Sequence, residues 1–165
     1  MLDKQQITSD LIEWMQDFVE KPNPLLNDWA PCPYARQARI NKAIEIVFSE
    51  PLSLVLNVER SLPLLEDKDV VIVCFDHTLI DANTIEELVR VHNSLLMTRD
   101  YVILEDHPDN TEMLNGVRMN FGKCGLLLVQ RLSKLSTASK QLKEKGYYDT
   151  WTEENYADIV AWREQ

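Results

Sequence analysis

Two acid–imidazole pairs are the residues of this chain best suited to chemistry. Asp76-His77 and Asp106-His107 each follow an apolar run directly, and Glu50 follows a third such run. Imidazole and carboxylate groups ligate zinc, iron and manganese, and they also share acid and base roles in catalysis. The pattern therefore predicts a divalent metal ion held by His77, His107 and Glu50, with Asp106 as the catalytic base. The same residue types also begin ordinary turns, so a purely structural role stays open.

The three apolar runs before these residues have the composition of β-strands. They are AIEIVF at 43–48, VVIVCF at 70–75 and YVILE at 101–105, and helical patterns separate them. This alternation predicts an α/β (α+β) fold with a single small sheet of three to four mostly parallel strands and packing helices. The carboxyl ends of the strands would then share one edge, where ligands commonly bind. The run GLLLV at 125–129 is either a fourth strand or the start of the helix that follows.

The length of 165 residues predicts a single domain, 1–165. Within it we expect an N-terminal helix at about 4–20, an α/β core at about 40–146 and a C-terminal helical arm at about 147–165. A helix opening at Asn83 would place His92 on its apolar face, which favours a core histidine over a ligand.

The stretch APCPYA at 30–35 holds the thiol with the most reactive surroundings that the sequence offers. If a short helix begins at Pro33, Cys32 lies near its N-cap, where the helix dipole and Arg36 would lower the thiol pKa. Cys32 is then a candidate nucleophile or redox switch, and Arg36 could bind an anionic group of a small acidic molecule. Alternatively the prolines and aromatics around Cys32 form a packed apolar plug that the thiol merely fills.

A glycine-rich segment, 111–125, contains three of the four glycines. Lys123 and the backbone N–H groups of 122–125 could bind a phosphate or carboxylate of the substrate. The alternative is a β-hairpin closed by Asn115-Gly116, with no ligand at all. The aromatic tail YYDTWTEENYADIVAW, 147–162, either caps the domain or exposes a patch for self-association.

The charge balance restricts the partners. A formal net charge of −10 and a pI of about 4.7 argue against nucleic acid and against an anionic membrane, both of which attract basic surfaces. No signal peptide or membrane-spanning run is visible in the sequence. Three cysteines without a CxxC spacing indicate reduced thiols, so we expect a cytoplasmic protein.

Several stretches together resemble a bacterial family of uncharacterised small proteins that carry a CPFA-type motif, here Cys32-Pro33-Tyr34-Ala35. In the order found in that family follow AIEIVFSEP, VVIVCFDHT, YVILEDHP and GLLLVQRLSKLSTAS. The resemblance covers about residues 10–145 and departs from the family at Thr78, where the family has proline. It implies a shared fold and a shared importance of Cys32, His77 and His107. Because the family has no assigned activity, it implies no reaction.

Two functions of different classes are consistent with the sequence. One is a small-molecule or metal site at the strand ends, supporting a metal-assisted, hydrolytic reaction on a small acidic molecule. The other is a non-enzymatic binding or assembly module that uses the N-terminal helix and the aromatic C-terminal segment. The positions and partners of His77 and His107 discriminate between the two.

Overall fold

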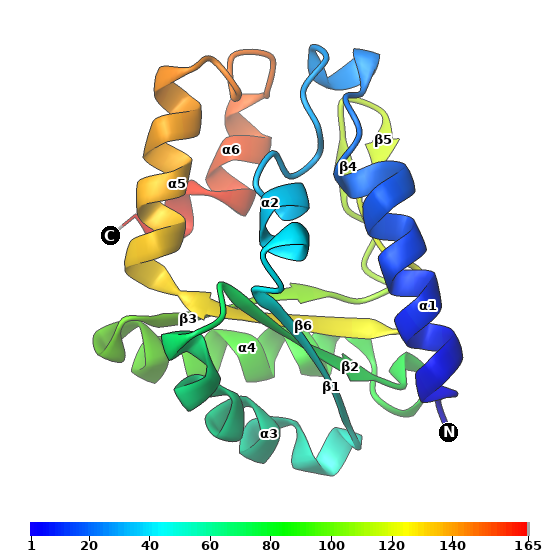
Figure 1. Cartoon of the computed structure of the whole chain (residues 1–165). Helices are drawn as coiled ribbons and strands as arrows, with labels where there is room; N and C mark the ends of the chain where they lie inside the picture. The colour runs from blue at the N-terminus through cyan, green and yellow to red at the C-terminus, as the bar shows by residue number, and fades with distance from the viewer. Residues whose placement is uncertain (165) are drawn as a thin grey trace.

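The computed structural model describes residues 1–164 and contains one four-stranded sheet in the spatial order β1-β2-β6-β3 (Figure 1). The strands are β1 (Ile44–Ser49), β2 (Val70–Phe75), β6 (Gly125–Arg131) and β3 (Tyr101–Asp106). β1 and β2 pair in parallel, whereas β6 pairs antiparallel with both β2 and β3. The α+β class and the three expected strands are confirmed, but the prediction of mostly parallel pairing is wrong. The chain returns from β3 to β6 without a crossover helix, so β6 runs backwards between two strands of the opposite direction.

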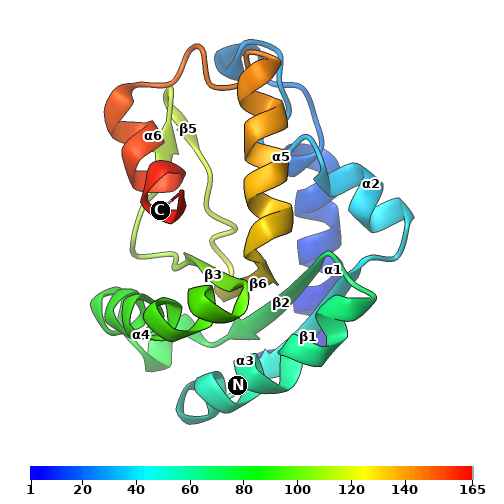
Figure 2. The same cartoon turned by 90° about the vertical axis from the view of Figure 1, so that its left-hand side faces the viewer.

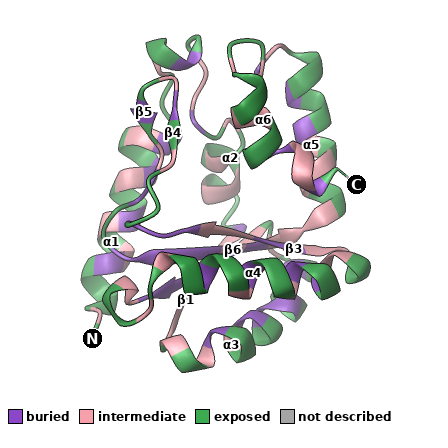
Figure 3. Cartoon of the chain, turned by 180° about the vertical axis from the view of Figure 1, so that it is seen from behind, coloured by how far each residue is buried: buried purple, intermediate pink, exposed green. Residues whose placement is uncertain are grey.

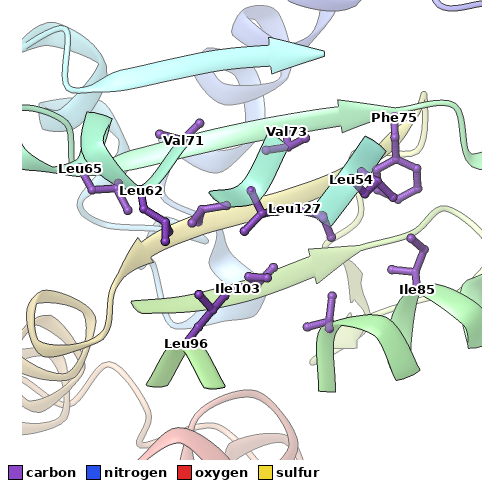
Figure 4. Close-up of a cluster of buried hydrophobic side chains, with 13 residues drawn as sticks. Leu54, Leu62, Leu65, Val71, Val73, Phe75, Ile85, Leu96, Ile103 and Leu127 are labelled. Atoms are coloured by element: carbon purple, nitrogen blue, oxygen red, sulfur yellow. The ribbon is translucent and has the colours of Figure 1, made fainter. Parts of the chain in front are cut away.

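Two helices cover one face of the sheet (Figures 1 and 2). They are α3 (Leu54–Ser61) and α4 (Ala82–Leu96), and both bury an apolar stripe. Figure 4 shows the resulting core, in which Leu54 and Ile85 meet Val73 and Leu127 of the central strands. Asp81, two residues before the predicted helix start at Asn83, caps α4 by accepting a hydrogen bond from the Thr84 N–H at 2.9 Å.

The other face carries the N-terminal helix and the elements of the C-terminal half. α1 (Lys4–Trp14) continues into a π-helical turn, Met15–Val19, so the predicted helix at about 4–20 is confirmed. It packs Ile7 and Leu11 against Ile72 and Leu126 of the sheet. Above the sheet stand α2 (Ala35–Ile40), α5 (Leu132–Glu144) and α6 (Glu153–Ile159). Short 3-10 turns complete the helices: Pro24–Leu26, Pro51–Ser53, Leu62–Glu66, His77–Leu79, Met97–Arg99 and Ala161–Arg163.

The glycine-rich segment forms the predicted hairpin. β4 (Met113–Leu114) and β5 (Val117–Arg118) pair antiparallel, and the turn residues Asn115 and Gly116 have φ values of 51° and 80°. Two positive φ values in succession are typical of a tight hairpin turn, for which Asn-Gly is the preferred sequence. The hairpin buries Leu114 and Val117 in a small second core.

The two edges of the sheet differ. β3 is covered by α4, because the buried Asn93 side chain donates to the Ile103 carbonyl at 2.9 Å and accepts from the Ile103 N–H at 2.8 Å. These two bonds replace those of a missing neighbouring strand. β1, at the opposite edge, pairs with no strand other than β2 within residues 1–164.

Gly125 leaves room for the aromatic ring of Phe75 to lie over β6 on one face of the sheet. It lies directly opposite Phe75, and a Cβ added to Gly125 would fall 2.1 Å from Cζ of the fully buried ring. The ring therefore occupies the space that any side chain at 125 would need. From there it reaches the end of β3, where its centroid lies 6.2 Å from that of His107.

We expect Gly125→Ala to lower the free energy of unfolding by about 2–3 kcal/mol, because the core around Phe75 must shift to admit a methyl group. Denaturant unfolding followed by circular dichroism measures this. Phe75→Leu, which removes the clashing ring atoms, should make the two substitutions less than additive. Strictly additive losses would show that the ring does not exclude a side chain at 125.

Candidate functional site

His107 is fixed by two hydrogen bonds to backbone groups. It is 2% exposed; its Nε2 lies 2.8 Å from the Ile80 carbonyl, and its Nδ1 accepts from the Asp109 N–H at 3.1 Å. A carbonyl only accepts and an amide only donates, so the proton is on Nε2 and the ring is neutral. Both ring nitrogens are therefore engaged, and neither has a lone pair free for a metal. His107 instead ties the end of β3 to the turn after β2.

His77 lies beside His107, as the sequence predicts. The two ring centroids are 5.8 Å apart and the ring planes are nearly perpendicular. Nδ1 of His77 is buried and has no hydrogen-bond partner within residues 1–164. The structure thus brings the two imidazoles together in an edge-to-face contact. Both ring nitrogens of His107 are hydrogen-bonded to the backbone.

Asp106 holds a loop. It is buried, and its two carboxylate oxygens accept from the Asn120 amide at 2.7 Å and from the Phe121 N–H at 2.9 Å. Burial raises the pKa of Asp106, and these hydrogen bonds and the nearby Arg118 oppose the shift. The catalytic role predicted for Asp106 needs a carboxylate that faces a substrate, whereas this one faces its own chain.

Asn120 is the partner that sequence analysis missed. Besides bonding Asp106, its amide donates to the Asn110 carbonyl at 3.1 Å, and its oxygen accepts from the Glu112 N–H at 2.8 Å. One side chain thereby fixes three points of the segment between β3 and β6. Its sequence context, a polar residue in a glycine-rich stretch, looks like any exposed loop position, so no local signal marks it.

Glu50 does not reach the two histidines. It is exposed at the end of β1, at one edge of the sheet, and β3 forms the other edge. With β2 and β6 between them, β1 and β3 are about 14 Å apart. Among residues 1–164, no three His, Cys, Asp or Glu side chains come together in an arrangement that could hold a metal ion. The predicted ligand set of His77, His107 and Glu50 is therefore not assembled: the two histidines meet, but Glu50 ends the edge strand β1, at the opposite side of the sheet from β3.

Glu105 is a partly buried acid that the sequence analysis did not single out. Its Oε2 is buried without a hydrogen-bond partner in the described chain. Burial, followed by repulsion from Glu86, Glu112 and Asp106, raises the pKa of Glu105 to about 7. Its position in an apolar strand, with an acid on the next residue, is the only signal that could have drawn attention to it.

Trp29 and the buried Pro31 contact Tyr147, as expected of an apolar plug, but Cys32 itself is exposed. Although the residue reaches solvent, desolvation raises the pKa of its thiol more than the N–H groups of Tyr34 and Ala35 lower it. The helix that was expected to lower this pKa begins only at Ala35. The hydroxyl of Tyr147 donates to the Pro31 carbonyl at 2.6 Å, which closes the plug from the C-terminal side.

The two predicted substrate-binding cations lie on different elements: Arg36 on α2, and Lys123 two residues before Gly125, at the edge where β2 and β3 end. Arg36 is exposed on α2. Lys123 forms an ion pair with Asp10 of α1, with Nζ and Oδ2 3.1 Å apart. Lys123 thus fastens the glycine-rich segment to the N-terminal helix, a use that competes with binding an anion.

Comparisons with known proteins do not add a relative. No family model, no curated protein sequence and no solved structure matched the chain significantly. The resemblance to the CPFA-type family accordingly stays a prediction. Within residues 1–164, none of the helices has the length and apolar character needed to cross a membrane.

Asn120→Ala should lower the free energy of unfolding by about 2–3 kcal/mol, because it leaves the buried Asp106 carboxylate and the Glu112 N–H without their partners. Hydrogen exchange should show the largest increase in residues 107–124. The matched control is Asn110→Ala, which removes an exposed amide and keeps the backbone carbonyl that Asn120 uses. Equal losses in the two variants would contradict the assigned role of Asn120.

Glu105 predicts a pH dependence of stability. The carboxyl binds a proton up to about pH 7 in the folded chain and only up to about 4.5 when unfolded, so stability falls as the pH rises between these values. Glu105→Gln should remove this loss and raise the free energy of unfolding at pH 8 by about 1–2 kcal/mol, with little change at pH 4. Urea unfolding at both pH values measures it, and exposed Glu66→Gln is the control. A Glu105→Gln variant that is no more stable than wild type at pH 8 would contradict the burial of this charge.

Proposed function

We propose that this chain is a polypeptide-binding module that acts through its surface rather than through chemistry at the strand ends. The observation that carries the proposal is the engagement of both His107 ring nitrogens by backbone groups. A histidine in this state neither ligates a metal nor exchanges a proton with a substrate. Asp106, held by Asn120 and Phe121, supports the same conclusion.

The aromatic C-terminal segment is not the surface that we propose for binding. Tyr147 is buried, and Tyr148 and Trp151 make edge contacts with it and with each other at centroid distances of 4.8 to 5.5 Å. These rings attach the C-terminal arm to the plug around Cys32. The aromatic residues that the sequence suggested as an exposed patch therefore make most of their contacts within the molecule.

Exposed apolar side chains are instead found on the elements that precede and follow β1. Ile40, at the end of α2, is 52% exposed; Leu52 and Leu56, in the turn and helix after β1, are 102% and 50% exposed. Apolar side chains that cluster around one element are typical of a protein-binding surface. The net charge of −10 favours a polypeptide over nucleic acid or an anionic membrane as the partner. Three free thiols, two of them buried, support a cytoplasmic location.

Metal analysis tests this proposal against its rival, a metal-assisted hydrolase acting on a small acidic molecule. Wild type, His77→Ala and His92→Ala are incubated with zinc, iron or manganese, desalted and analysed for bound metal. We expect the same low metal content in all three proteins. Near-stoichiometric metal that His77→Ala loses and His92→Ala keeps would overturn the proposed function and support the strand-end site.

A further inference from the structure

β1 is an open strand edge without the usual protection. Its sequence, IEIVFS, has no proline or glycine and a single charge, and all six residues are only partly buried. An edge strand presents a row of unpaired N–H and C=O groups that another strand can bind. At the opposite edge, the side chain of Asn93 occupies the backbone groups of Ile103 in β3, whereas no side chain does this at β1 within residues 1–164.

We propose that β1 pairs antiparallel with β1 of a second copy of this chain, which joins the two four-stranded sheets into one. This inference names the partner of the proposed binding module and so rests on that proposed function. The partner adds backbone hydrogen bonds along β1 and covers the apolar residues that flank it. The two copies are related by a two-fold axis perpendicular to the sheet.

The faces of β1 limit the register. Ile44, Ile46 and Phe48 face the layer that contains α1, whereas Val47 faces the layer that contains α3. Directly opposite residues of an antiparallel pair lie on the same face of the sheet. A residue of one copy must therefore lie opposite a residue on the same face of the other copy. This requires the two-fold axis to pass between one residue and the identical residue of the second copy, so that one residue of β1 is directly opposite itself.

An axis at Ile46 gives a complementary interface. It sets Ile46 opposite its own copy and Ile44 opposite Phe48, so three apolar contacts line one face of the joined sheet. Beyond the paired strands, Lys42 of each copy, in the turn before β1, comes near Glu50 of the other. Both are exposed, and within residues 1–164 neither forms an ion pair.

The neighbouring registers are poorer. An axis at Glu45 would set two carboxylates directly opposite one another, and like charges in this position are destabilising. An axis at Val47 would set apolar Ile44 opposite the charged Glu50. The register centred on Ile46 matches apolar with apolar residues on the face of Ile44, Ile46 and Phe48, and on the other face it sets Glu45 opposite Val47.

A charge exchange tests the pairing. Lys42→Glu and Glu50→Lys each create two like-charge pairs in the proposed register, and each should weaken the dimer about tenfold. The combined variant, Lys42→Glu with Glu50→Lys, should restore the wild-type affinity because the opposite charges face each other again. Sedimentation velocity over a range of concentrations measures the mass and the dissociation constant. Lys140→Glu, an exposed site on α5 with the same change in net charge, is the control and should leave the dimer intact.

Hydrogen exchange locates the contact. The amides of 44–49 should exchange more slowly as the concentration rises, and those of β3 should not change. A monomer at all concentrations would overturn the proposal and leave the β1 edge to a strand of another protein. A dimer that is indifferent to the charge exchange would overturn it equally, because the copies would then meet elsewhere. Neither result changes the outcome of the metal analysis. The sedimentation experiment tests the pairing of β1, and the metal analysis tests the proposed function, so the two can fail independently.

Discussion

β6 returns between β2 and β3 and holds the ends of these two strands about 10 Å apart. That gap would expose the end of the core if it were not bridged. The ring of Phe75 bridges it by lying across Gly125, the first residue of β6, and His107 packs above the ring from the far side. The position of His107 then determines the turn at Ile80 and the start of α4. One missing side chain at position 125 thus allows the core, the turn and the helix to meet.

The polar residues at this edge illustrate how one set of chemical properties serves two purposes. Imidazole and carboxylate groups attract attention as catalysts because they make strong, directional hydrogen bonds. His107 and Asp106 use that same capacity on backbone groups of adjacent segments. In a molecule whose β3–β6 connection has little regular structure, such bonds replace the ladder and helix bonds that would otherwise fix the chain. The burial pattern agrees, since the strands are buried up to this edge and the connections beyond are more exposed (Figure 3).

Local patterns predicted the elements well, and they did so where a single physical signal dominated. Apolar, β-branched runs located β1, β2 and β3, and Asn115-Gly116 located the hairpin turn. Such local signals could not predict the direction of β6. The run GLLLV has the same composition whether the strand pairs parallel or antiparallel with its neighbours. That one undetermined direction also affects the predicted site. β6 lies between the strands β1 and β2 on one side and β3 on the other, so Glu50 at the end of β1 is far from the end of β3, whereas His77 and His107 still meet across β6.

The partners of individual polar side chains were equally invisible. Asn93 and Asn120 each satisfy backbone groups eight to ten residues away, and nothing in their local sequence distinguishes them from surface asparagines. Such contacts depend on how the elements are stacked and not on the elements themselves. Cys32 shows the converse: the helix start suggested by its neighbours does lower the thiol pKa through the N–H groups of Tyr34 and Ala35, but desolvation, which the local sequence does not reveal, raises that pKa more.

The amide of Asn93 has a consequence for how this molecule can combine with others. A sheet with two open edges is bivalent, and strand addition at both edges leads to chains of indefinite length. Because Asn93 occupies the hydrogen-bonding groups of β3 at its centre, this sheet has a valence of one. Any strand added at β1 therefore ends the growth of the sheet, and a single asparagine separates a finite complex from a fibre.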